Sequence, residues 1–167
     1  IFQDYVKYHL TAAENIAVGR IEERNNEARI MEAAQRSLAD TVIDKLAEGY
    51  QQMIGRWFKQ GTNLSGGECQ KIAIARPYMR DAQLLILDEP TAALDARAEH
   101  EVFKRFVELT YDKCAVLISH RFSTVRMADR IVVLHDGKLL EHGTHEDLLA
   151  AKGQYSELFQ MQAAGYR

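Results

Sequence analysis

A run of apolar residues followed at once by two carboxylates constrains the fold of this chain more than any other stretch. Residues 84–87 read Leu-Leu-Ile-Leu, and Asp88, Glu89 and Pro90 follow them. A short, continuous apolar run is typical of a strand that is buried on both faces of a parallel sheet. Pro90 should end the strand, because proline has no N–H group to donate to a neighbouring strand.

Asp88 and Glu89 are therefore expected just beyond the carboxyl end of this strand, where open α/β sheets bind their ligands. Two acids at such a place can divide the work of a hydrolytic site. One holds a metal ion, while the other orients or deprotonates a water molecule. A strand followed by a solvated acidic turn is the alternative interpretation of the same residues.

The residues that follow predict a strand–helix–strand unit. Asp95 is a good N-cap for a helix that runs to about Thr110, and residues 114–118 form a second β-type run that ends at Ser119 and His120. Such a unit has parallel strands and a right-handed crossover. His120 is then expected at the same sheet edge as the two acids, although a single histidine at a strand end can also be purely structural.

Ser65, Gly66 and Gly67 stand immediately before a helical pattern. Free backbone N–H groups at a helix N-terminus, aided by the helix dipole, form a ready site for an anion. A Ser-Gly-Gly turn can equally be a simple helix cap. Pro77 is expected to bend or end this helix, because it lacks an N–H group.

Weaker signals organise the rest of the chain. A Thr-x-x-Glu capping box at Thr11 predicts a short helix that ends near Gly19, and residues 21–48 are helical in pattern with a cap expected at Asp40. A short helix is expected over 123–129. A hairpin that turns at residues 136–137 and a last helix from Gln154 complete the pattern.

The composition is ordinary for a soluble globular protein, with 47% hydrophobic and 27% charged residues among 167. A formal net charge of −3 gives no support to nucleic-acid binding. The two cysteines, Cys69 and Cys114, are isolated and do not have the spacing of metal ligands. No apolar run approaches the length of a membrane span.

Taken together, the motifs resemble those of ATP-binding cassette (ABC) ATPases. In order along the chain they are Leu-Ser-Gly-Gly-Glu-Cys-Gln at 64–70, Leu-Leu-Ile-Leu-Asp-Glu-Pro at 84–90, Ala-Leu-Asp at 93–95 and Ile-Ser-His at 118–120. Phe2-Gln3-Asp4 resembles the glutamine loop of the same family. The similarity is closest to the nucleotide-binding domains of exporter-type transporters.

The resemblance implies an α/β fold, namely a partial P-loop NTPase (RecA-like) parallel sheet with an α-helical signature subdomain. Residues 1–10 would form the glutamine-loop segment, and residues 11–80 the helical subdomain with the signature. Residues 81–167 would form the C-terminal part of the RecA-like core, with the Walker B acids, the D-loop and the switch histidine.

The resemblance also implies a role for each motif residue. Asp88 would be the Walker B aspartate that holds Mg²⁺, and Glu89 the general base that polarises the attacking water. Gln3 would contact the Mg²⁺ and water region and sense the membrane domain. His120 would contact the γ-phosphate and the catalytic water. These roles agree with phosphoryl transfer as a matter of positioning and charge stabilisation.

Other motif residues would act across a dimer. Ser65, Gly66 and Gly67 would bind the γ-phosphate of ATP held by the opposite subunit, and Asp95 would belong to the D-loop that communicates between subunits. The implied partners are a second nucleotide-binding domain in a head-to-tail dimer and the transmembrane domain of a transporter, at the cytoplasmic face of the cell membrane.

One departure from the family pattern is decisive for activity. The family's Walker A loop, Gly-x-x-x-x-Gly-Lys-Ser/Thr, is absent from these 167 residues. The one Gly-Lys pair, Gly137-Lys138, precedes Leu139 in an expected hairpin turn and cannot serve. We therefore expect a C-terminal fragment that is inactive alone. The unpaired edge of strand 84–87 should favour self-association.

Two alternatives to an exporter ATPase domain stay open at this point. The chain can be a truncated module that associates with a complete cassette through its signature motif without catalysis. It can also belong to an ABC ATPase that does not serve transport. Smaller departures from the exporter pattern are Cys69, where a bulky or basic residue is frequent, and Pro77, where alanine is usual.

Overall fold

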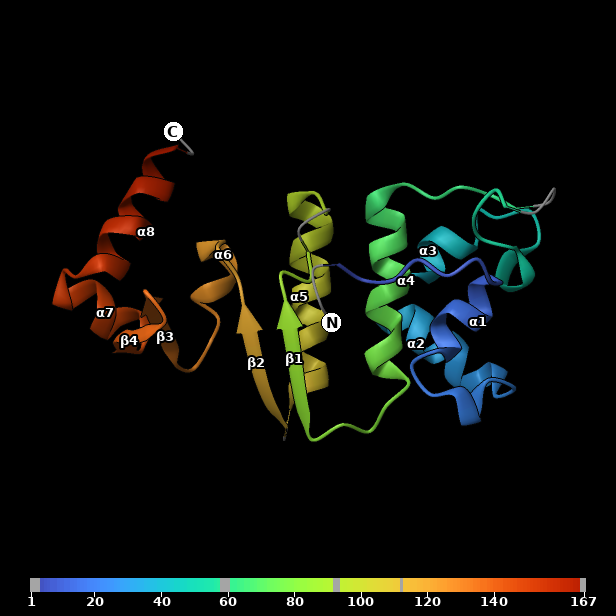
Figure 1. Cartoon of the computed structure of the whole chain (residues 1–167), viewed down its shortest axis with the longest axis horizontal. Helices are drawn as coiled ribbons and strands as arrows, with labels where there is room; N and C mark the ends of the chain where they lie inside the picture. Colours follow the sequence, from blue (N-terminus) through green and yellow to red (C-terminus); the bar gives the residue numbers. More distant parts are fainter. Residues whose placement is uncertain (1–3, 58–60, 92–93, 112, 166–167) are drawn as a thin grey trace. The chain divides into compact units, whose positions relative to one another are not determined.

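The computed structural model describes residues 4–57, 61–91, 94–111 and 113–165 (Figure 1). The chain forms two compact units, Ile1–Val116 and Leu117–Arg167. The sequence-based division at residues 10 and 80 stays a prediction. Within the described residues, no helix is both long and apolar enough to span a membrane.

The first part of unit Ile1–Val116 is helical (Figure 1). Its elements are α1 (Ala12–Ala17), the 3-10 turn η1 (Ile21–Glu23), α2 (Glu27–Ser37), α3 (Asp40–Ile43), the 3-10 turn η2 (Gly49–Gln51) and α4 (Gly66–Tyr78). Helix α4 packs against α1 and α2. Ile16, Ile43 and Ile74 are fully buried in these helices, so they form the centre of this layer.

The predicted capping box at Thr11 is confirmed. The Thr11 Oγ1 accepts a bond from the Glu14 N–H at 3.2 Å, and the Glu14 carboxylate accepts one from the Thr11 N–H at 2.9 Å. The cap predicted at Asp40 is wrong. Ala39 is the N-cap of α3, and the Asp40 carboxylate accepts instead from the N–H of Thr41, one residue along.

The turn that follows α1 approaches α4 closely at Gly19. A Cβ atom there would lie 2.1 Å from the Arg76 carbonyl oxygen, so only glycine fits. The Arg80 side chain also donates to the Gly19 carbonyl. Pro77 does not kink α4 in its middle, because the helix ends one residue later, at Tyr78.

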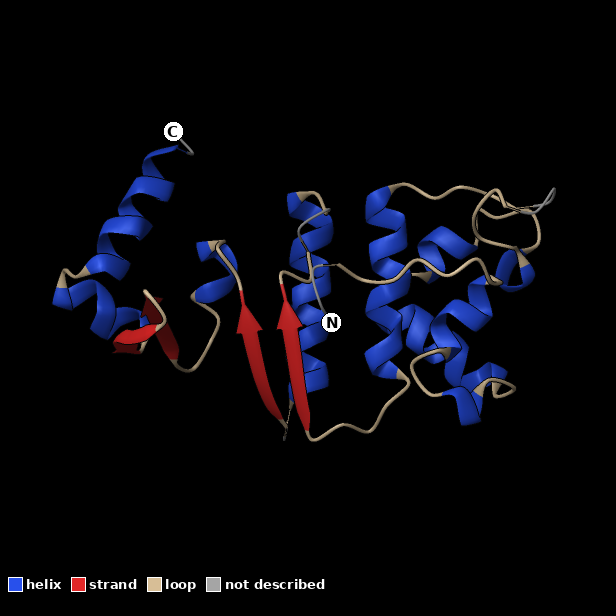
Figure 2. Ribbon diagram, viewed as in Figure 1, coloured by secondary structure: helices blue, strands red, loops and turns tan. Residues whose placement is uncertain are grey.

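The second part of this unit begins with β1 (Leu84–Asp88) and α5 (Ala96–Thr110). Strand β1 pairs with β2 (Cys114–Ile118), and the two strands run parallel (Figure 2). This is the strand–helix–strand order that the sequence predicts.

The expectation that β1 is buried on both faces is wrong for this chain. Leu85 and Leu87 are buried, but Leu84 is 50% and Ile86 45% exposed. Since successive side chains of a strand point to opposite faces, one face of β1 is covered and the other is open.

Unit Leu117–Arg167 holds α6 (Phe122–Val125), the hairpin strands β3 (Ile131–His135) and β4 (Lys138–Gly143), α7 (His145–Ala151) and α8 (Gln154–Gly165). The turn predicted at residues 136–137 is confirmed, with φ of 48° at Asp136 and 72° at Gly137. Helix α6 is shorter than the predicted 123–129. Ile131, Leu148 and Tyr155 form a small core.

Ile74→Ala tests whether α4 is the central element of the helical layer. We expect the free energy of unfolding to fall by about 2–5 kcal/mol, because the truncated side chain leaves a cavity in a packed core. Urea denaturation followed by circular dichroism measures this change. Ile21→Ala is the matched control, since Ile21 is 56% exposed. Equal losses in the two variants would contradict this description.

Candidate functional site

The end of β1 forms a strained turn that carries both candidate acids. Asp88 is the last residue of the strand, and Glu89 follows with a φ of 43°, in the left-handed region. Both residues are partly buried. A residue other than glycine in this region costs on the order of 1–3 kcal/mol, and such strain clusters at active sites. The surrounding structure therefore holds Asp88 and Glu89 in one defined conformation.

Buried neighbours fix this turn from the C-terminal side. Pro90 is fully buried and Thr91 is 3% exposed. The Thr91 hydroxyl donates to the Glu99 carboxylate at 3.2 Å, and Glu99 is itself buried in helix α5. The segment after the acids is thus anchored to α5 by a buried hydrogen bond.

Asp95 caps helix α5, as the sequence predicts. Its carboxylate accepts bonds from the N–H groups of Ala98 at 2.9 Å and Arg97 at 3.0 Å. The bond from Ala98 is the main reason that the pKa of Asp95 lies below its usual value. The side chain is exposed, so it lies at the surface while it holds the helix start.

The Ser-Gly-Gly turn is the start of α4 and is built as a capping box. Ser65 is the N-cap, and its Oγ accepts a bond from the Glu68 N–H at 3.3 Å. The Glu68 carboxylate accepts in return from the Ser65 N–H at 2.8 Å. The bond from the Ser65 N–H is the main reason that the pKa of Glu68 lies below its usual value. Ser65 and Gly66 are exposed, so an anion can reach the first turn of the helix.

Sequence reasoning missed the role of Glu68, although the signal was present. Ser65 and Glu68 have the Ser-x-x-Glu spacing of a capping box, the same pattern that identifies the start of α1 at Thr11.

The segment that follows the candidate glutamine is bonded to α4. Gln3 itself lies outside the described residues. Tyr5, two positions later, donates its hydroxyl hydrogen to the Gly66 carbonyl at 2.9 Å. Partial burial raises the pKa of Tyr5. No sequence pattern indicated this contact, because the partners lie 61 positions apart.

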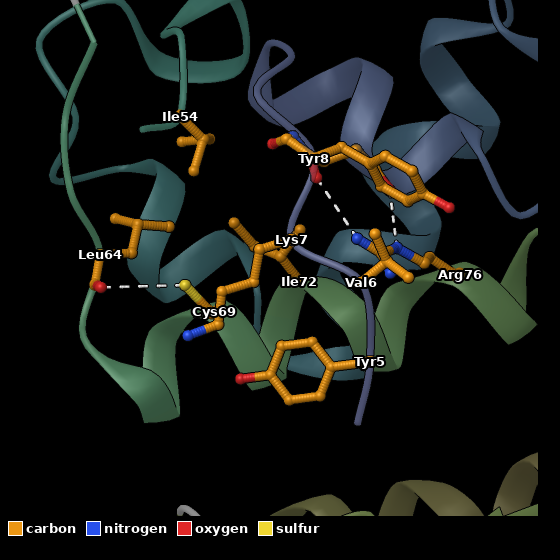
Figure 3. Close-up of a pocket in the computed structure, with 10 residues that line it drawn as sticks. Tyr5, Val6, Lys7, Tyr8, Ile54, Leu64, Cys69, Ile72 and Arg76 are labelled. Carbon is orange, nitrogen blue, oxygen red and sulfur yellow. Dashed lines mark hydrogen bonds between the residues drawn. The ribbon is translucent and has the colours of Figure 1, made fainter. Parts of the chain in front are cut away.

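Asn15 and Arg76 anchor the same segment further along. The Arg76 guanidinium donates to the Asn15 carbonyl at 3.0 Å and to its side-chain oxygen at 3.3 Å, and it lies 5.0 Å from the centre of the Tyr8 ring (Figure 3). The Asn15 amide donates in turn to the carbonyls of Tyr8, Leu10 and Thr11. Burial lowers the pKa of Arg76.

A pocket between this segment and α4 holds only about 20 Å³ (Figure 3). That is room for about one water molecule, far too little for a nucleotide. Cys69 lines it and lies 3.8 Å from the Leu64 carbonyl, and burial raises the pKa of its thiol. We interpret this pocket as a packing feature.

His120 follows β2, and its side chain is exposed. Its carbonyl accepts a hydrogen bond from Gln162 at 2.8 Å. Since His120 belongs to unit Leu117–Arg167 and the two acids belong to unit Ile1–Val116, their expected meeting at one sheet edge stays a prediction.

Asp88 and Glu89 fit the donor preference of Mg²⁺. This ion favours carboxylate oxygens and is usually held by one or two of them, together with water and substrate phosphates. Two adjacent carboxylates at a strand end match that requirement. Within the described residues, no larger group of His, Cys, Asp and Glu with metal-ligand geometry occurs.

Comparison with known proteins identifies the family. A family model described as ABC transporter matches residues 1–92, which is more than half of the chain and includes Ser65, Asp88 and Glu89. The chain belongs to the ABC transporter family. It is 41% identical over 158 residues to a subtilin transport ATP-binding protein of Bacillus subtilis, a match that covers 95% of this chain and 26% of that protein.

Other relatives of this ABC chain are, by their names, a flippase and an exporter. An ATP-dependent lipid A-core flippase of Salmonella typhimurium is 43% identical over 162 residues, which cover 97% of this chain and 27% of the flippase. The solved structure of a bacterial Atm1-family ABC exporter with ATP bound superposes with a TM-score of 0.87 at 36% identity, over 97% of this chain and 27% of the exporter chain. The predicted α/β fold class and the similarity to exporter domains are thereby confirmed. This chain spans about a quarter of the length of these relatives.

A pH titration tests the capping box at the start of α4. Because the folded-state pKa of Glu68 lies below the ordinary value of 4.5, its stabilising contribution is present above about pH 4.5 and is lost as the pH falls through the folded-state pKa. We expect Glu68→Gln to lower the free energy of unfolding by about 0.3–1 kcal/mol at pH 7. The difference from wild type should shrink between pH 5 and pH 3 in urea denaturation.

Glu48→Gln is the control for this titration, because Glu48 is exposed and its side chain makes no capping bond. Its difference from wild type should stay small over the same pH range. A Glu68→Gln effect that does not depend on pH would contradict the assigned role of the carboxylate.

Proposed function

We propose that this chain supplies the magnesium-holding, water-activating and signature parts of the ATP site of an ABC exporter. The observation that carries the proposal is the strained turn at the end of β1. There Asp88 ends a strand, and Glu89 is held at a φ of 43° with a buried Pro90 behind it. Membership of the ABC transporter family supports the same assignment.

The two acids have different tasks in this proposal. Asp88 holds Mg²⁺, directly or through water, and Glu89 accepts hydrogen bonds from the attacking water and polarises it. Bound Mg²⁺ neutralises charge that develops on the phosphate oxygens. The fixed turn keeps the Glu89 carboxylate in place, so that no reorganisation is needed when the reaction starts.

The remaining site residues contact the γ-phosphate, the Mg²⁺ or the catalytic water. His120 contacts the γ-phosphate and the catalytic water, and Gln3 contacts the Mg²⁺ and water region. Ser65 and the N–H groups of Gly66 and Gly67 bind the γ-phosphate of ATP held by a second nucleotide-binding domain. The exposure of Ser65 and Gly66 at the N-terminus of a 13-residue helix supports this last assignment.

The names of the relatives support export as the purpose of hydrolysis. The flippase and the Atm1-family exporter are similar to this chain over almost its whole length. We infer that the chain works beside a transmembrane domain, at the cytoplasmic face of the cell membrane. Asp95, at the exposed start of α5, faces the second nucleotide-binding domain of a head-to-tail dimer in this proposal.

These 167 residues contain no Gly-x-x-x-x-Gly-Lys-Ser/Thr loop. Backbone N–H groups and a lysine of such a loop hold the phosphates in P-loop ATPases. We therefore expect the site to need a phosphate loop from outside residues 1–167. Strand β1 pairs only with β2 among the described strands, and self-association through its other edge stays a prediction.

A chimaera tests the proposed function. In it, this whole chain replaces the matching segment of the Salmonella typhimurium flippase, which supplies the upstream sequence. We expect Mg²⁺-dependent ATP hydrolysis by the chimaera. Glu89→Gln should lower kcat by about 10²–10⁴-fold, because the water loses its general base, while ATP binding is retained. Phosphate release and equilibrium binding of labelled ATP measure the two properties.

Glu101→Gln is the matched control on α5, since Glu101 forms an exposed ion pair with Lys104 at 3.6 Å. It should hydrolyse ATP at the rate of the parent chimaera. A folded chimaera that binds ATP without hydrolysing it, or hydrolysis that survives Glu89→Gln, would show the proposal to be wrong.

A further inference from the structure

Gln162 of helix α8 bonds to the backbone of the segment that carries His120. The Gln162 amide nitrogen donates to the His120 carbonyl at 2.8 Å, and the Gln162 amide oxygen accepts from the Phe122 N–H at 3.1 Å. The nitrogen and the oxygen of one side-chain amide are therefore both bonded to backbone groups, and these belong to residues two positions apart. Sequence reasoning did not indicate this contact, because Gln162 lies 42 positions from His120.

Aromatic packing holds the same segment against α8. The Phe122 ring makes edge-to-face contacts with Tyr155 at 5.2 Å and with Phe159 at 5.3 Å between ring centres. Edge-to-face pairs of this kind stabilise the packing beyond the area that they bury. Phe122 thus brings its backbone N–H to α8, where Gln162 accepts the bond.

Helix α8 is itself fixed at its N-terminus. The Glu141 carboxylate of β4 accepts bonds from the N–H groups of Gln154 at 2.7 Å and Tyr155 at 3.1 Å. The Tyr155 hydroxyl is 2.8 Å from the His145 Nδ1 at the start of α7. Gln162 is therefore presented by a helix that is tied to the hairpin and to α7.

Within the loop, Ser119 supplies one more bond. Its hydroxyl oxygen accepts from the Arg121 N–H at 3.0 Å. This bond turns the chain locally, but it does not connect the loop to another element. The two bonds from Gln162 tie the backbone of residues 120–122 to α8.

We propose that Gln162 is a positioning residue for His120. It fixes the backbone on both sides of residue 121, and this backbone sets the direction of the His120 side chain. The proposal rests on the role given above to His120 in ATP hydrolysis. Because Gln162 touches no reacting group, its loss should affect the rate of the chemical step more than the binding of ATP.

Gln162→Leu tests the contact in the 167-residue chain itself. We expect the Phe122 amide to exchange its hydrogen about 5- to 10-fold faster in hydrogen–deuterium exchange, since a typical hydrogen bond contributes about 1 kcal/mol. Gln160→Leu is the matched control on the same helix, because Gln160 bonds to Ser156 at 3.4 Å within α8. Equal exchange at Phe122 in the two variants would overturn the proposal.

The flippase chimaera tests the consequence for hydrolysis. We expect Gln162→Leu to lower kcat about tenfold with KM for ATP changed less than twofold, and Gln160→Leu to match the parent. Gln162→Glu keeps the acceptor for Phe122 but loses the donor to the His120 carbonyl, so its kcat should lie near that of Gln162→Leu.

The outcomes separate this proposal from the proposed function. If the parent hydrolyses ATP and Glu89→Gln does not, unchanged kcat in Gln162→Leu overturns only the positioning role. A parent chimaera without hydrolysis overturns the proposed function and the positioning role that rests on it. A rise in KM with unchanged kcat would also overturn positioning, because it indicates an effect on binding alone.

Discussion

The pair of buried Asn15 and half-buried Arg76 is the interaction on which the N-terminal half depends. Asn15 is 3% exposed and uses its amide to bind three backbone carbonyls of the segment 8–11, while Arg76 reaches back from α4 to bind Asn15. A buried polar group that loses its partner costs about 1–3 kcal/mol, so the members of this network depend on one another. The network holds the segment after Gln3 on the helix that begins at Ser65.

Candidate site residues stand at the ends of elements, where backbone groups lack partners within the element. Ser65 is the N-cap of α4, Asp95 is the N-cap of α5, and Asp88 ends β1. Each end is fixed in a different way. A reciprocal capping box fixes Ser65. The Asp95 carboxylate accepts bonds from two N–H groups, and Asp88 precedes a left-handed Glu89 that is followed by a buried proline. Rigid ends of this kind keep phosphate-binding groups in position before a ligand arrives.

Short sequence patterns predicted much of the local structure, but they did not predict contacts between residues that lie far apart in the chain. The caps at Thr11 and Asp95 and the turn at Asp136 each follow from the chemistry of one to four neighbouring residues. The contacts of Tyr5 with Gly66 and of Gln162 with His120 depend on how elements pack, which no short pattern encodes. The wrong expectation for β1 has a physical reason as well: its apolar run predicts two covered faces, whereas Leu84 and Ile86 are half-exposed in this chain.

We infer that the acids of β1 are placed for hydrolysis but need a phosphate loop from outside residues 1–167. Steady-state phosphate release by the purified chain in Mg-ATP, beside its Glu89→Gln variant, tests this most directly. Equal background rates for the two proteins are the predicted result. Mg²⁺-dependent turnover by the chain alone that disappears in Glu89→Gln would show that the acids do not need such a loop.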